Sequence, residues 1–242
     1  MHAIAKQKSP VNSIFEMVVG RHHTNFWLQK INPLWSIHQA LGKIIEKNQS
    51  AQDTISLTIE VNRHFKMGQA GQHHPVIIEV NGRRYERTYS LTQLDAHRVL
   101  LTVKKVAEGI VSQWLTETAQ IGDVLEFGQP YGEMLIPKTE QPLILLAAGS
   151  GITPMYSLVK KLDELGHLGQ KSVRLMYWVK KNQDTVFKKQ FETIAEQYPS
   201  FKFDVFYTQE NPSDARLNAE YLDQIQSLEK SIVYVCGPSG FV

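Results

Sequence analysis

The feature that most constrains the fold is an uninterrupted apolar run at residues 143–148, followed at once by a glycine-rich turn. A strand that is apolar on both faces is typical of a parallel sheet covered by helices on both sides. The segments expected around it are a helix at 153–165, a strand at 173–179, a helix at 186–198, a strand at 203–207, a loop and short helix through 222, and a strand at 232–236. This alternation predicts a doubly wound α/β domain.

Residues 42–136 follow a different pattern, in which short segments alternate apolar and polar residues. In the clearest segment Ile55, Leu57, Ile59 and Val61 share one face. Asn81-Gly82 predicts a tight hairpin, because both residues tolerate the positive φ of a type I′ turn. About six short antiparallel strands with one helix at 111–117 predict a small closed barrel.

The change of pattern divides the chain. We expect a short helical segment at residues 1–36, a six-stranded antiparallel barrel at 37–139 and the α/β domain at 140–242, with the boundary near residues 137–142. The chain stops directly after a strand, where a covering helix normally follows. We therefore expect the α/β domain to be incomplete and the chain to be a fragment of a longer polypeptide.

Composition excludes several classes of function. The formal net charge is +2, too close to neutral to indicate a nucleic-acid partner. The longest apolar run is far below the ~20 residues that a membrane-spanning helix requires. Cys236 is the one cysteine, so these residues cannot supply a disulfide or the four thiolates of an iron-sulfur cluster. A cytoplasmic protein is expected.

The N-terminal segment is rich in aromatic residues. Phe26, Trp27 and Trp35 lie in or beside a stretch with helical spacing that ends at Asn32-Pro33. They could form a surface for a partner or a membrane. We favour packing against the barrel, because apolar stripes are usually part of a core.

The glycine-rich turn is the strongest indication of a ligand. Gly149-Ser150-Gly151-Ile152-Thr153-Pro154 joins the apolar strand to a helix. Glycines allow close approach of a ligand, and free amides at a helix start attract phosphate. Proline occupies the third glycine position of the usual dinucleotide pattern, and a tight turn without a ligand is the alternative. Cys236-Gly237-Pro238 ends a later strand, so its thiol is expected at the same sheet edge unless it is an inert buried group.

The barrel contains two weaker motifs. Arg87-Thr88-Tyr89-Ser90-Leu91 lies in a strand, with Arg87 and Tyr89 on one face and Ser90 on the other. Gly109-Ile110-Val111-Ser112 begins a helix and could bind phosphate or simply cap the helix.

Two pairs of adjacent histidines are candidate metal ligands. His73-His74 lies on a strand, where neighbours face opposite ways, and no carboxylate or cysteine accompanies it. His22-His23 is set aside for the same reason. We predict no metal site.

The order and separation of the four motifs resemble the ferredoxin-NADP reductase superfamily. The resemblance covers about residues 37–242 and is greatest to bacterial reductases that serve fatty-acid desaturases and to flavodoxin or ferredoxin reductases. The segment Ile31-Asn32-Pro33-Leu34-Trp35 favours the desaturase partners. In that group a plant-type 2Fe-2S domain commonly follows, and it would lie beyond Val242.

The resemblance implies specific roles for these residues. Arg87 would pair with a flavin phosphate, Tyr89 would stack on the isoalloxazine ring, and Ser90 would hydrogen-bond near N5. The neighbouring Thr88 and Leu91 would complete this flavin site. The backbone from Gly109 through Ile110 and Val111 to Ser112 would hold the pyrophosphate, which favours FAD over FMN.

In the second domain, the six residues Gly149, Ser150, Gly151, Ile152, Thr153 and Pro154 would receive the nicotinamide nucleotide. Cys236, with Gly237 and Pro238, would lie against the nicotinamide, so Ser90 and Cys236 are the expected catalytic residues.

NADPH is favoured over NADH because Lys180 and Lys181 follow the second strand of the α/β domain, near the expected 2′-phosphate. Asp184 argues against this preference, and Arg216 is a further phosphate candidate. The predicted function is electron transfer from NADPH through FAD to a ferredoxin or fused 2Fe-2S domain, for a membrane desaturase or an oxygenase. The alternatives are an NADH-dependent reductase component of an oxygenase and a non-catalytic flavin- or nucleotide-binding module.

Overall fold

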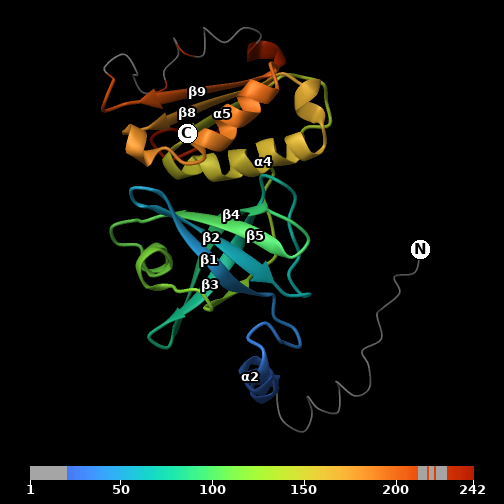
Figure 1. Ribbon diagram of the computed structural model, residues 1–242, viewed down its shortest axis with the longest axis vertical. Helices are drawn as coiled ribbons and strands as arrows, with labels where there is room; N and C mark the ends of the chain where they lie inside the picture. Colours follow the sequence, from blue (N-terminus) through green and yellow to red (C-terminus); the bar gives the residue numbers. More distant parts are fainter. Residues whose placement is uncertain (1–20, 212–216, 218–220, 222–227) are drawn as a thin grey trace, which may run out of the picture.

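The segments with alternating apolar residues form a closed antiparallel barrel. The computed structural model describes residues 21–211, 217, 221 and 228–242, and the barrel order is β1-β2-β5-β4-β3-β6 (Figure 1). The strands are β1 (Leu41–Ala51), β2 (Thr54–Val61), β3 (His73–Val80), β4 (Arg83–Gln93), β5 (Arg98–Lys104) and β6 (Val124–Phe127). Fully buried side chains such as Ile44, Leu57 and Leu101 fill the interior. The predicted six-stranded barrel is confirmed.

The turn between β3 and β4 sets the register of β4, the strand that carries the arginine motif Arg87-Thr88-Tyr89-Ser90-Leu91. Asn81 and Gly82 have φ values of 52° and 72°, as a type I′ turn requires. Pairing then runs from Val80 opposite Arg83 to His73 opposite Ser90. A local turn preference therefore fixes which β3 residue lies beside each member of the motif.

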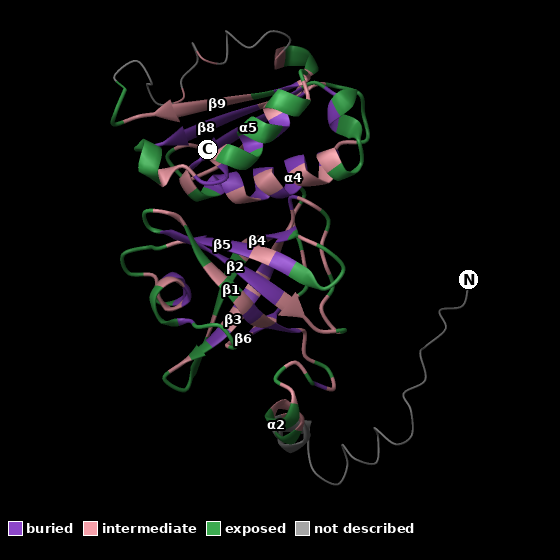
Figure 2. Cartoon of the chain, viewed as in Figure 1, coloured by how far each residue is buried: buried purple, intermediate pink, exposed green. Residues whose placement is uncertain are grey.

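The second domain is a four-stranded parallel sheet in the order β10-β7-β8-β9. Its strands are β7 (Leu143–Ala148), β8 (Val173–Val179), β9 (Phe201–Tyr207) and β10 (Ile232–Cys236). Every residue of β7 is buried. One face packs against α4 (Ile152–Glu164) and α5 (Lys188–Gln197) (Figures 1 and 2). The predicted α/β architecture is confirmed, and the expected short helix near residue 222 lies mostly outside the described residues.

The prediction that the N-terminal aromatic residues pack against the barrel is wrong for the two tryptophans. Helix α2 (Arg21–Ile31) is joined to the barrel by polar contacts, with Ile37 N donating to Asn25 Oδ1 at 3.0 Å. Trp27 is 65% exposed and Trp35 49%. The Phe26 side chain lies outside the described residues. Polar anchoring leaves Trp27 and Trp35 exposed.

No helix within the described ranges has the length and apolar character needed to cross a bilayer.

Candidate functional site at the domain seam

Strand β4 has an open edge where the arginine motif lies. Arg87 pairs with Val76 and Ser90 with His73 on β3, but pairing with β5 comprises only Leu91, Thr92 and Gln93. Residues 87–90 therefore have no strand partner on the β5 side. Unpaired backbone groups of this kind can be satisfied by a ligand.

Two side chains of the motif differ sharply in environment. Arg87 is exposed, whereas Tyr89 is half-buried and packs against the barrel core. Burial raises the pKa of Tyr89 to about 12, and the nearby Arg87 charge acts in the opposite direction. The phenol is therefore neutral at physiological pH, and a rigid ring lies beside an accessible cation.

The glycine-serine turn of the barrel lies near the same strand, because α3 (Ile110–Gln113) contacts β4. The helix continues as a π-helical turn, η1 (Trp114–Thr118). The Ser112 hydroxyl is buried, donates to Gly109 O at 3.0 Å and accepts from Val106 N at 3.2 Å. These two hydrogen bonds hold the turn closed and occupy the Ser112 hydroxyl. An anion would therefore be bound by the first backbone amides of α3, which have no intrahelical partner.

The nucleotide turn, η2 (Gly149–Gly151), packs directly on the end of β10. Gly149 has a φ of 53°, and its carbonyl accepts from the Tyr177 hydroxyl at 3.1 Å. A Cβ atom on Gly151 would lie 2.0 Å from Cys236 O. The glycine at 151 therefore serves close backbone packing, and the structure brings the turn and Cys236 together at one sheet edge.

Cys236 is a half-buried free thiol whose side chain packs against the core of the sheet domain. Burial raises the pKa of this thiol. A neutral thiol is a poor nucleophile, since the thiolate is the reactive form. Its environment suits packing against a ligand.

The predicted 2′-phosphate residues lie on an exposed loop that also carries carboxylates. Lys180 and Lys181 follow β8, and Lys181 N donates to Asp184 Oδ2 at 3.2 Å. Asn182 N donates to Glu210 Oε2 at 2.8 Å. The loop is therefore close to neutral. Arg216 lies outside the described residues.

Both predicted binding regions adjoin the seam between the domains. Ser157 on α4 donates to Leu91 O at 3.2 Å, next to Ser90 in the chain. On the sheet side, Gly149 and Thr153 line a narrow cleft of about 10 Å³ with residues of β2 and β5. That volume is about the size of one water molecule, so the nucleotide turn lies close against the barrel.

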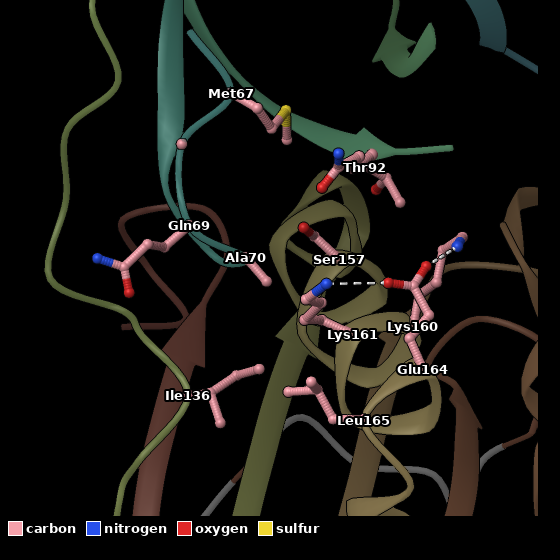
Figure 3. Close-up of a pocket in the computed structure, with 12 residues that line it drawn as sticks. Met67, Gln69, Ala70, Thr92, Ile136, Ser157, Lys160, Lys161, Glu164 and Leu165 are labelled. Atoms are coloured by element: carbon pink, nitrogen blue, oxygen red, sulfur yellow. Dashed lines mark hydrogen bonds and ion pairs between the residues drawn. The ribbon is translucent and has the colours of Figure 1, made fainter. Parts of the chain in front are cut away.

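A larger pocket of about 260 Å³ opens elsewhere on the seam (Figure 3). Met67, Ala70 and Ile136 supply apolar lining, and Lys160 and Lys161 both donate to Glu164. No predicted cofactor residue lines this pocket, whose whole lining is described.

Sequence reasoning missed Ser157 and Tyr131. The Tyr131 hydroxyl lies 2.9 Å from Thr88 Oγ1, and its ring packs edge-on against His73. The turn-rich segment around Gly132 was the available signal for Tyr131. Ser157, a small polar residue in the apolar stripe of α4, gave none beyond its type.

The described residues contain no cluster of three or more His, Cys, Asp or Glu side chains arranged to hold a metal ion.

Comparison with known proteins identifies both domains. Residues 41–136 match the family described as oxidoreductase FAD-binding domain, and residues 145–242 match the oxidoreductase NAD-binding domain. The chain belongs to the ferredoxin-NADP reductase superfamily. The predicted superfamily and the predicted pair of cofactors, FAD and a pyridine nucleotide, are thereby confirmed.

Relatives of this reductase chain include an NADPH oxidoreductase of Mycobacterium tuberculosis, 29% identical over 88% of this chain and 57% of the relative. The toluate 1,2-dioxygenase electron transfer component of Pseudomonas putida is 27% identical over 80% of this chain and 58% of its own length. The reductase chain spans about half the length of the curated relatives it matches.

Among solved structures, phthalate dioxygenase reductase superposes with a TM-score of 0.66 at 26% identity, covering 83% of this chain and 60% of that one. The FAD/NAD-binding domain of a Vibrio cholerae nitric oxide dioxygenase gives 0.75 at 22% identity, covering 84% and 89%, which supports the fold.

Proposed function

We propose that this reductase chain takes electrons from NADPH through FAD and passes them singly to an iron-sulfur protein. The acceptor would be a ferredoxin or a 2Fe-2S domain fused beyond Val242, and the downstream enzyme a membrane fatty-acid desaturase or an oxygenase. The observation that carries the proposal is that the FAD-binding and NAD-binding domains meet at one seam, where Ser157 on α4 donates to Leu91 O on β4. Relatives named as dioxygenase electron-transfer components support the electron-transfer role.

The barrel residues fit a flavin nucleotide. FAD, when bound, supplies the redox chemistry by accepting hydride and releasing electrons one at a time. Arg87 would bind phosphate through its exposed guanidinium, and the amides at the start of α3 would bind the remaining pyrophosphate charge. Tyr89 would offer a ring already fixed by burial, and the Ser90 hydroxyl would donate or accept one hydrogen bond.

The α/β residues fit the nicotinamide nucleotide. The turn at Gly149 carries no side chain to obstruct an approaching phosphate, and nothing lies within 4 Å of a Cβ atom built there. Cys236, neutral and half-buried, would limit where the nicotinamide ring can lie. Holding the hydride donor, nicotinamide, and the acceptor, flavin, in one orientation accounts for a large part of the rate of hydride transfer.

An NADH-dependent reductase component is the second candidate. Asp184 and Glu210 accept backbone hydrogen bonds in the loop that carries Lys180 and Lys181. Carboxylates there would oppose a 2′-phosphate and favour the free ribose hydroxyl of NADH.

Anaerobic stopped-flow mixing tests the proposal. FAD-loaded protein should lose its flavin absorbance on mixing with NADPH and regain it when a one-electron iron-sulfur acceptor is added. A flavin that stays oxidised with both NADPH and NADH would establish the non-catalytic module. Loss of flavin absorbance at a much lower concentration of NADH than of NADPH would establish the NADH-dependent reductase component.

Flavin affinity gives a separate readout. Arg87→Ala should weaken FAD binding about 10-fold or more, since a charge-assisted hydrogen bond contributes about 1.5–3 kcal/mol. Arg83→Ala is the matched control, because Arg83 is also exposed but lies at the hairpin end of β4. Equal dissociation constants for the two variants, measured by flavin fluorescence, would remove Arg87 from the site.

A further inference from the structure

Helix α2 exposes large apolar side chains along one line. Trp27 is 65% exposed, Ile31 73%, and Trp35 in the turn that follows 49%. Trp27 and Ile31 are four residues apart and so share one face of the helix. Side chains of this size are rarely left exposed together on a protein that has no partner surface.

The surroundings of these side chains are basic. Between Glu16 and Glu46 the sequence contains no acidic residue, while Arg21 and Lys30 lie within that stretch. Lys30 is exposed beside Ile31. Arg63, also exposed, lines an open groove of about 510 Å³ together with Leu28 and Trp35.

We propose that α2 and Trp35 form a membrane-docking surface that lies on an anionic phospholipid bilayer. Tryptophan favours the depth of the lipid headgroups, where its ring is apolar and its N–H is hydrated. Exposed Lys30 and Arg63 complement the negative surface of the bilayer. A helix of 11 residues is too short to span a membrane, so it would lie in the interface plane.

The position of α2 is compatible with electron transfer during docking. It lies at the end of the barrel opposite the sheet domain, so a bilayer there leaves the seam exposed to solvent (Figure 1). This proposal goes beyond the proposed function, because it concerns where the protein binds and holds even if the electron acceptor is different.

Co-sedimentation of the FAD-loaded protein with phosphatidylcholine vesicles, with and without phosphatidylglycerol, tests the surface. Binding should be clear with the anionic vesicles and weak without them. Trp27→Ser combined with Ile31→Ser should lower the partition coefficient at least about tenfold. Lys30→Glu should lower it about fivefold or more on anionic vesicles and leave binding to neutral vesicles unchanged.

Ile121→Ser is the matched control, since Ile121 is 67% exposed but lies in the turn before β6. Its binding should equal that of the unaltered protein. Unchanged partition for both the double variant and Lys30→Glu would overturn the proposal, as would an unaltered protein that ignores anionic vesicles. A dimer detected by ultracentrifugation and lost in the double variant, without lipid binding, would assign the surface to a second copy of this chain.

Discussion

Acid should loosen the barrel strand that supports the flavin motif, through one buried histidine. His74 is 1% exposed and lies opposite Tyr89 in the β3–β4 register. Its Nε2 accepts from Gly68 N at 3.3 Å, and its ring stacks on Phe65. Burial lowers the pKa of His74 from 6.5 to about 4. The folded protein therefore holds this ring neutral.

The direction of the pH effect follows from the pKa values of His74 in the unfolded and folded states. Because the pKa is lower in the folded state, the unfolded chain binds the proton more readily and acid favours unfolding. The stability that neutral His74 contributes is fully present above about pH 6.5, falls as the pH drops toward 4, and does not change further below that pH. A pKa difference from 6.5 to about 4 corresponds to about 3 kcal/mol in total, of which about 2 kcal/mol is lost by pH 5.

Urea unfolding at pH 7 and pH 5, followed by circular dichroism, measures this effect. His74→Gln cannot titrate in this range and keeps an acceptor for Gly68 N, so its loss of stability between the two pH values should be about 2 kcal/mol smaller. His97→Gln, at an exposed position, is the matched control and should behave like the unaltered protein. Equal pH dependence in all three proteins would refute the reasoning.

Three further predictions concern the seam and its loops. Ser90→Ala should keep FAD bound but slow flavin reduction about 10-fold or more in stopped-flow experiments; an unchanged rate would remove the hydroxyl from its role. Replacing Lys180 and Lys181 by Glu should raise KM for NADPH but not for NADH, and equal effects would exclude a 2′-phosphate contact there. Gly151→Ala should cost about 1–3 kcal/mol or more in urea unfolding, because its Cβ would lie 2.0 Å from a β10 carbonyl. Gly169→Ala, with open space around its Cβ, should cost clearly less.

Periodicity made most of the fold predictable. The all-apolar β7 could be satisfied only by cover on both faces. The alternation in β2 predicted that Ile55, Leu57 and Ile59 face the barrel interior, but not that Thr54, Ser56 and Thr58 on the other face are buried as well. Boundaries were accurate where a local signal coincides with the element end, as at the Asn81-Gly82 turn. Strand β9, in contrast, begins at Phe201, two residues earlier than expected, because its start is set by pairing with Val173 on β8.

The contacts that build the site were less predictable, because they are non-local. Nothing near Ser112 in the sequence shows that its hydroxyl accepts from Val106 N and closes the turn. Ser157 and Leu91 are 66 residues apart, and their bond depends on how two separately folded domains meet. The exposure of Trp27 was missed because an apolar stripe indicates that something covers it but not whether that is the same chain.

The two sides of the seam differ in what joins the domains there. Buried Ser157 holds the end of β4 against α4, whereas the cleft beside Gly149 has room for about one water molecule. A nicotinamide ring that reaches the flavin side of the seam needs more space than this cleft provides. Ser157 joins α4 to the end of β4 beside Ser90, so the strand that carries residues 87–91 is held against the sheet domain.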